Sequence, residues 1–216
     1  MTKIIHIVLG RANPNRMNGV NKVVHNLANA QVDLGHNVSV WGLTKSINKP
    51  DEVTDRRYVV EWFSPSSLPF FIPSNLFKAI SNEEDVRFHM HGGFITTFIP
   101  LSILLFKLGK KQFLTPHGAY TQGAMQRNGV FKYLYFKCVE SLMLGRLSSI
   151  QCLGHNEEAF LNNLKPNAKI SLIPNGHNWS DSVKKCRNKG NEKFIIGYCG
   201  RLSKWHKGLD VLIKAF

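Results

Sequence analysis

The sequence is poor in cysteine, and the few cysteines it has are isolated from one another. Its 216 residues include four of them, with no CxxC pair: Cys138, Cys152, Cys186 and Cys199. Such spacing argues against a disulfide framework and against a cysteine zinc site. The sequence therefore favours reduced thiols in a cytosolic protein.

Long hydrophobic runs are also scarce. The most apolar stretch, residues 94–109, is interrupted by Thr96, Thr97 and Pro100. It is shorter than the ~20 apolar residues that a membrane-spanning helix needs. The first ten residues resemble a strand and have no small-residue cleavage site after them, so no secretory signal is predicted. We expect a cytoplasmic protein in which residues 94–108 form a buried or interfacial helix.

Acidic side chains are half as frequent as basic ones. The chain has 28 Lys and Arg against 14 Asp and Glu, a formal charge of +14 and a pI near 9.8. Residues 1–100 carry 10 basic and 8 acidic side chains, whereas residues 101–216 carry 18 and 6. An excess on one half favours an anionic partner: nucleotide phosphates, nucleic acid or acidic lipid. Nucleic acid ranks last, because no RNA- or DNA-binding motif is present and the basic residues are dispersed.

Short apolar runs alternate with segments of helical periodicity along most of the chain. Strands are predicted at "KIIHIVLG", "NVSVWGL", "RYVVEWF", "VRFHMHG", "KQFLTPHG", "SSIQCLG" and "AKISLIPNG". Helices are predicted near residues 20–34, 94–108, 130–146 and 156–164, with a shorter one capped by Ser74. Strict alternation of strand and helix is typical of a doubly wound parallel sheet with helices on both faces, a Rossmann-like α/β fold.

The alternation fails between residues 177 and 193, which are polar, basic and without periodicity. We predict one domain over residues 1–176, a linker over 177–193, and the first strand and helix of a second domain over 194–216. Nothing in the last residues resembles a helix stop signal. The second domain is therefore expected to be incomplete, which implies a truncated reading frame or a fragment.

Candidate site residues follow the strands, because ligands of open α/β sheets bind outside the carboxyl ends of the strands. Gly19 follows the first loop and opens a helix, where backbone N–H groups and the helix dipole favour a phosphate or a sugar. The alternative is an ordinary turn glycine. The loop lacks GxGxxG, which disfavours a nicotinamide cofactor.

Three histidines lie at the ends of two later strands. His89 and His91 share one face of a strand, but no third ligand follows at a metal-binding spacing, so we favour a structural or hydrogen-bonding role over a metal. His117 precedes Gly118 and a polar loop, where its side chain would face a cleft. The alternative for His117 is a histidine satisfied by neighbouring backbone.

Arg201 and Lys207 flank a turn between a strand and a helix. A guanidinium, an ammonium and free backbone N–H groups would converge there, an arrangement that suits a diphosphate. A pair of solvated surface charges is the alternative.

The segments "IPNG" (173–176) and "GYCGRLSKWHKGLDVLIKAF" (197–216) resemble the signature of glycosyltransferase family 4, retaining enzymes of the GT-B fold. The likeness is strong over 173–216 and weak before it. It implies two Rossmann-like domains, the first binding mainly the acceptor and the second mainly the nucleotide-sugar. It also implies a nucleotide-sugar donor, such as a UDP- or GDP-sugar, and that neither a cofactor nor a metal is required.

The resemblance assigns roles residue by residue. Arg201 and Lys207 would hold the donor diphosphate, Gly19 would line the cleft, and His117 would contact the reacting sugar. The residues expected to act in catalysis are His117, Arg201 and Lys207. Those expected to bind substrate are Asn18, Gly19, His91, Gly118, Asn175, Gly200, Arg201 and Lys207.

The sequence departs from the family pattern in three places. Asn18-Gly19 replaces the common Gly-Gly, and His177-Asn178 replaces an aliphatic residue and Asp. The glutamate motif that grips the donor falls beyond residue 216, so this chain alone is expected to be inactive.

Two functions follow from these observations. The first is a glycosyltransferase acting on a glycan or lipid-linked acceptor in cell-surface polysaccharide or lipopolysaccharide synthesis. The alternative is a non-catalytic product that retains only acceptor or membrane binding. Three lysines at the end of the 94–108 helix (Lys107, Lys110, Lys111), and aromatic residues mixed with lysines over 131–137, favour peripheral binding to the anionic inner face of a membrane. Aromatic core residues beside solvated lysines are the competing interpretation.

Overall fold

The computed structural model describes residues 2–16, 18–49, 53–126, 129–165, 167–176, 197–198 and 208–215. Contacts divide the chain into two compact units, residues 1–176 and 177–216. In the second unit, α9 (Leu209–Ala215) is the helix expected near residues 207–216. The predicted strand at 194–200 and the linker lie largely outside the described residues, so the proposed domain limits remain a prediction.

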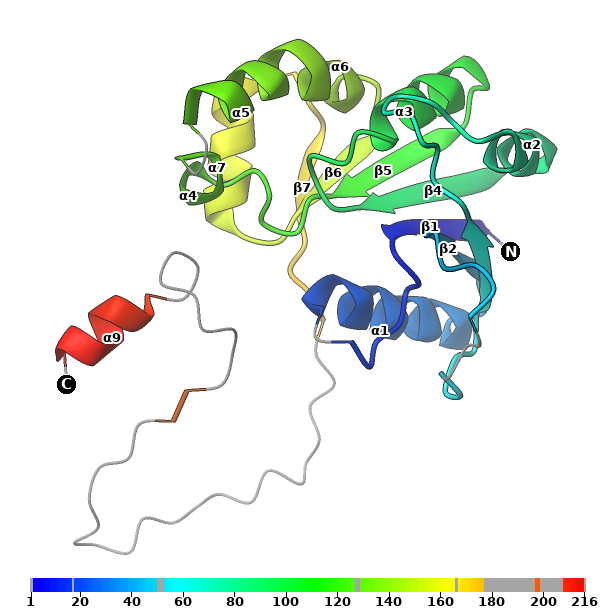
Figure 1. Ribbon diagram of the computed structural model, residues 1–216, viewed down its shortest axis with the longest axis horizontal. Helices are drawn as coiled ribbons and strands as arrows, with labels where there is room; N and C mark the ends of the chain where they lie inside the picture. The colour runs from blue at the N-terminus through cyan, green and yellow to red at the C-terminus, as the bar shows by residue number, and fades with distance from the viewer. Residues whose placement is uncertain are drawn as a thin grey trace, which may run out of the picture. The chain divides into compact units, whose positions relative to one another are not determined.

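The first unit is built on an entirely parallel seven-stranded sheet (Figure 1). Its strand order is β3-β2-β1-β4-β5-β6-β7. The strands are β1 (Lys3–Leu9), β2 (Asn37–Leu43), β3 (Val59–Phe63), β4 (Val86–His91), β5 (Lys111–Thr115), β6 (Ser149–Cys152) and β7 (Ile170–Leu172). All seven predicted strands are present, and the α/β doubly wound class is confirmed.

Helices connect the strands and cover the sheet. They are α1 (Gly19–Asp33), α2 (Ser74–Asn82), α3 (Phe98–Lys107), α4 (Gln122–Gln126), α5 (Gly129–Tyr135), the π-helix η1 (Phe136–Glu140), α6 (Ser141–Leu144) and α7 (His155–Leu164). In Figure 1, α1 lies on one face of the sheet, and α3, α6 and α7 lie on the other.

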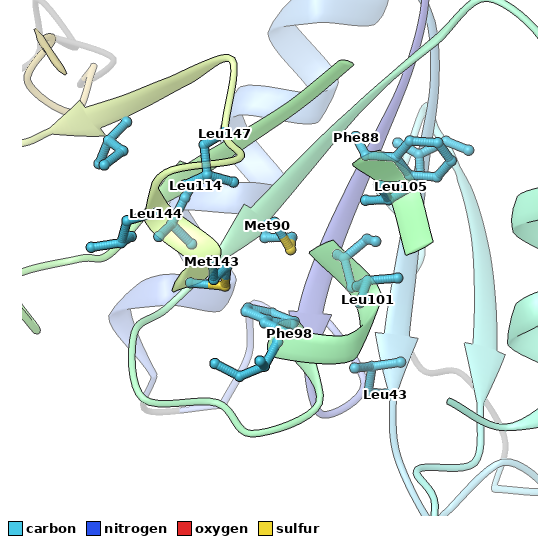
Figure 2. Close-up of a cluster of buried hydrophobic side chains, with 14 of the residues drawn as sticks. Leu43, Phe88, Met90, Phe98, Leu101, Leu105, Leu114, Met143, Leu144 and Leu147 are labelled. Carbon is cyan, nitrogen blue, oxygen red and sulfur yellow. The ribbon is translucent and has the colours of Figure 1, made fainter. Parts of the chain in front are cut away.

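Alternation along the strands produces two separate cores. Ile5 and Ile7 of β1 join Phe88 and Met90 of β4 in the larger core beneath α3 and α6. Figure 2 shows Phe98, Leu101, Met143 and Leu144 gathered around Met90 and Leu114. On the opposite face, Val24 and Ala28 of α1 pack on Val8, Val38 and Val40. Each helix therefore buries its apolar stripe on the strand residues that face it.

Several predicted boundaries were wrong for local reasons. The helix expected at 94–108 begins only at Phe98, because Phe94 takes a left-handed conformation with φ of 59°. Ser74 is the first residue of α2 and caps nothing; Pro73 holds the N-cap position. The helix expected at 130–146 is interrupted by η1, and the loop after β5 contains α4, which was not predicted.

Candidate active site

The strand order reverses between β1 and β4, so the loops that leave their carboxyl ends diverge, which is the position where ligands of open α/β sheets bind. Val8 pairs with His91 at the end of these strands, and His91 pairs with Thr115 of β5. The loops after β1, β4 and β5 are therefore adjacent. Most of the predicted site residues of the first unit lie on these three loops.

The first loop meets α1 at Asn18 and Gly19, both of which are exposed. The Asn18 side-chain oxygen accepts a hydrogen bond from the backbone N–H of Val20 at 3.0 Å and caps the helix. Asn18 thus satisfies one of the N-terminal N–H groups of α1, which a glycine at this position would leave free. Gly19 has open space around its Cα, as expected for a residue that a ligand can approach.

Glycines allow the loops after β4 and β5 to touch. A Cβ on Gly93 would lie 2.7 Å from the Cβ of Ala119 and 2.9 Å from the Tyr120 ring. Gly92, with φ of 111°, donates its N–H to the Thr115 carbonyl at 2.8 Å. No larger side chain fits between these loops without moving the backbone.

His117 lies at the carboxyl edge of the sheet and contacts His91. Its φ is 55°, an unusual conformation for a residue other than glycine, and Gly118 follows with φ of 79°. Such a conformation costs about 1 kcal/mol and is typical of functional loops. His117 Nε2 lies 3.0 Å from Nδ1 of His91, which is itself 2% exposed. The structure thus brings together the predicted residues His91, His117 and Gly118.

A third buried histidine, His6 of β1, joins this group and was missed in the sequence. Its Nδ1 lies 2.9 Å from Nε2 of His91, and its Nε2 lies 2.7 Å from the Gln31 side-chain oxygen. His6, His89 and His91 each offer a nitrogen within 4.8 Å of the others, a set that could hold a metal. The expectation that no third ligand accompanies His89 and His91 was therefore wrong, because parallel pairing brings His6 beside His89.

The imidazoles are held in their neutral form. Burial lowers the pKa of His6 and that of His117 to about 4, and it holds the pKa values of His89 and His91 well below 6.5. Coulombic repulsion among neighbouring imidazoles lowers the pKa of His89 and His91 further. At neutral pH the cluster can accept or donate hydrogen bonds but carries no charge.

Two buried carboxylates, also unpredicted, hold the loops at this edge. Glu140 accepts hydrogen bonds from the Phe94 N–H at 2.8 Å and from the Tyr120 hydroxyl. Glu157 accepts hydrogen bonds from the backbone N–H groups of Tyr120 and Leu153, each at 3.4 Å. Burial raises the pKa of both carboxyls. Together they tie the loops after β4, β5 and β6 to one another.

The positions of these two carboxylates explain why they were missed. Glu140 lies in a segment that reads as a continuous helix, and only the π-helix turns it inward. Glu157 is the third residue of α7, but the N-cap is Gly154 and not Ser or Thr, so the sequence carries no complete capping box that would mark this carboxylate.

A cavity of about 660 Å³ lies between α4 and α7. Its lining includes Thr121, Gln122, Asn156, Asn163 and the ring of Phe160. Hydroxyl and amide groups beside an aromatic ring can bind the hydroxyls and the apolar face of a sugar.

The remaining predicted residues belong to the C-terminal part of the chain. Asn175 is exposed in the segment that follows β7. Gly200, Arg201 and Lys207 lie outside the described residues, so their convergence on a diphosphate remains a prediction.

The entirely parallel sheet, whose strand order reverses between β1 and β4, places the chain in the doubly wound α/β class. The model of glycosyltransferase family 4 matches residues 17–179, and the chain belongs to that family. No curated protein sequence matches it.

Solved structures share the fold. Sucrose-phosphate synthase from Thermosynechococcus elongatus aligns with a TM-score of 0.58 and 17% identity, covering 82% of this chain and 49% of that one. A second structure of that synthase aligns with a TM-score of 0.52 and 17% identity, covering 82% of this chain and 91% of that one. The chain thus spans about half the length of the first synthase structure.

The first prediction concerns the carboxylate that ties the loops after β4 and β5. Replacing Glu140 by alanine leaves the Phe94 N–H and the Tyr120 hydroxyl buried without an acceptor. We expect a loss of about 2–4 kcal/mol in the free energy of unfolding by urea. Glu140→Gln keeps one oxygen and should lose clearly less. Equal stability of the alanine variant and the wild type would show that Glu140 does not hold these loops.

The second prediction concerns His6. Its pKa of about 4 in the folded state lies below the ordinary 6.5, so the unfolded chain binds more protons between these values. The contribution of neutral His6 is therefore fully present above pH 6.5 and is lost as pH falls towards 4, a difference of order 3 kcal/mol. Urea unfolding at pH 7 and pH 5 should show a smaller drop in stability for His6→Gln than for the wild type. Identical drops would contradict the assignment.

Proposed function

We propose that the protein transfers a sugar, with retention of configuration, from a UDP- or GDP-sugar to a glycan or lipid-linked acceptor. Cell-surface polysaccharide or lipopolysaccharide synthesis is the proposed setting, and the cytoplasm is the proposed location. The supporting observation is the constellation at the carboxyl edge of the sheet: His117, His91 and the glycine-lined loops, in a chain of glycosyltransferase family 4. Because the chain spans about half of the synthase it resembles, this activity is proposed for the complete gene product.

The proposed roles follow from what each group offers. His117 provides a neutral imidazole that accepts a hydrogen bond from a hydroxyl of the reacting sugar. Gly19 exposes the N-terminus of α1, which stabilises negative charge on the donor. Arg201 and Lys207 neutralise the diphosphate as it leaves, so the reaction needs no metal.

The proposed acceptor site is the cavity between α4 and α7. Its amide and hydroxyl groups suit a polar ligand, and the half-buried Phe160 offers a ring against which a sugar can pack. This cavity adjoins the loop that follows His117, since Thr121 lies four residues beyond that histidine. A glycan bound there would extend towards His117 at the carboxyl edge of the sheet.

The third prediction tests His117 in the complete gene product. Labelled UDP-glucose, UDP-N-acetylglucosamine and GDP-mannose are supplied with lipid and polysaccharide fractions of the source cells. We expect His117→Ala to lower kcat/KM by roughly 30- to 1000-fold, the equivalent of ~2–4 kcal/mol of transition-state stabilisation.

The matched control is His36→Ala. His36 lies just before the amino end of β2, at the opposite edge of the sheet, so this variant should keep full activity. Sugar transfer by His117→Ala at the wild-type rate would show that His117 takes no part in the mechanism. Failure of every donor to react would count against the proposed activity itself.

We further propose that the acceptor is reached at an anionic membrane surface. No described helix is both long enough and apolar enough to cross a bilayer. The side of α5 exposed to solvent is strongly apolar: Val130 is 72% exposed, Phe131 84% and Leu134 50%. Lys137 lies 5.0 Å from the ring of Tyr133 on the same segment, an arrangement suited to a headgroup boundary.

The structure modifies the surface that the sequence suggested. Phe136 is 1% exposed and belongs to the core. Lys132 turns towards the ring of Phe94 and the Ala124 carbonyl. Lys110 precedes β5 and Lys111 is its first residue, whereas α5 follows β5, and the Lys110 ammonium donates a hydrogen bond to the Glu83 carbonyl. The exposed residues of α5 are therefore the better candidates for membrane contact.

The fourth prediction is tested by co-sedimentation with vesicles. The protein should bind phosphatidylglycerol vesicles at low salt, should bind phosphatidylcholine vesicles weakly, and should dissociate as salt rises. Phe131→Ala with Leu134→Ala should weaken binding at least tenfold, because each side chain contributes about 1.5–3 kcal/mol when buried in the lipid boundary. Val59→Ala, an exposed apolar residue on β3, is the control. No binding to anionic vesicles would indicate a soluble acceptor.

A further inference from the structure

A continuous chain of hydrogen bonds runs from α1 across one face of the sheet to its carboxyl edge, where His117 lies. Gln31 contacts His6 at 2.7 Å, His6 contacts His91 at 2.9 Å, and His91 contacts His117 at 3.0 Å. His6 is fully buried and His91 is 2% exposed, so water does not substitute for these partners. We call these four side chains the histidine relay.

The acceptor at the start of the relay determines where every proton lies. The Gln31 side-chain oxygen can only accept, so His6 must donate from Nε2. A neutral imidazole carries one proton, which leaves His6 Nδ1 as an acceptor for the Nε2–H of His91. By the same rule His91 Nδ1 accepts from the Nε2–H of His117.

The last histidine then has a defined free nitrogen. With Nε2 protonated, His117 Nδ1 carries a lone pair, and none of the described residues forms a hydrogen bond with it. Burial supports the neutral state throughout, since it lowers the pKa of each of the three histidines.

We propose that Gln31 is a positioning residue that sets the tautomer of His117 through His6 and His91, leaving His117 Nδ1 as an acceptor for a sugar hydroxyl. The identity of the ligand rests on the proposed function. The tautomer is a property of the free protein. A hydrogen-bond donor in place of the Gln31 oxygen would reverse the direction of every hydrogen bond in the relay. His117 would then present an N–H group to the sugar.

The relay also accounts for the histidine cluster without a metal ion in it. Both ring nitrogens of His6 and both of His91 bond to other side chains, and Nε2 of His89 contacts the Thr115 hydroxyl at 2.7 Å. A metal bound by His6, His89 and His91 would have to replace a hydrogen bond at His6 and at His91.

The test reads the tautomers directly. Long-range ¹H–¹⁵N correlation of histidine-labelled protein, with no sugar present, distinguishes protonated from unprotonated ring nitrogens. In the wild type at pH 7 we expect His6, His91 and His117 all to be protonated at Nε2. His117 found mainly as the Nδ1–H form would overturn the proposal, whatever the variants do.

Substitutions at Gln31 test its control over the relay. Gln31→Glu keeps an acceptor and should preserve the tautomers. Gln31→Leu removes the acceptor and should lower the ratio of Nε2–H to Nδ1–H forms at His117 about fivefold or more, the worth of one hydrogen bond. The control is Gln151→Leu, which removes a partner of Thr115 on the same sheet face but lies outside the relay. An unchanged ratio in Gln31→Leu would overturn the proposal.

Two further measurements separate the competing explanations. If one equivalent of Zn²⁺ shifts the resonances of His6, His89 and His91 together, the cluster is a metal centre and the relay proposal is wrong. In the complete gene product, Gln31→Leu should lower kcat more than it raises KM for the nucleotide-sugar, with recovery in Gln31→Glu. If no sugar is transferred but the tautomers are as expected, the proposed function fails and the relay stands.

Discussion

Parallel pairing of β1 with β4 is the constraint on which the candidate site depends. The register sets His6 against His89 and Val8 against His91, so polar side chains from two strands meet on one sheet face. The same pairing marks the point where strand order reverses and the connecting loops separate. A shift of this register by one residue would turn every histidine of β4 into the apolar core beneath α3. The site and the core are therefore specified by the same backbone hydrogen bonds.

Buried polar groups organise the edge of the sheet in two different ways. The histidines are kept neutral by burial and satisfy one another, so they require no countercharge. Glu140 and Glu157 instead draw backbone N–H groups and a hydroxyl from three loops towards two carboxyls. Polar networks of this kind specify one arrangement, because any other leaves donors unpaired in the interior. They give a set of loops the fixed geometry that transition-state binding requires.

Much of the fold could be read from the sequence, because alternation between apolar strands and amphipathic helices is a local signal. The strand at "VRFHMH" and the helix over 19–33 show how strong that signal is. The missed features depend on contacts between distant residues. His6 gained its role only from pairing with β4, and the π-helix that turns Glu140 inward has no clear sequence signature. Phe94, with its positive φ, is likewise held by a contact with a distant residue, the hydrogen bond from its N–H to Glu140.

The candidate site residues show the same contrast between local sequence signals and contacts of distant residues. The sequence could place Asn18, Gly19, His91, His117 and Gly118 at one edge of the sheet because they end or follow strands, and the carboxyl ends of parallel strands share one edge. Predicting which of them touch required the register.

The proposed mechanism requires a sugar to bind at this edge against His117. A structure of the complete gene product with a bound nucleotide-sugar would test this requirement. We expect a sugar hydroxyl at about 3 Å from His117 Nδ1, a normal hydrogen-bond distance. A sugar bound elsewhere, with His117 Nδ1 facing solvent, would contradict it.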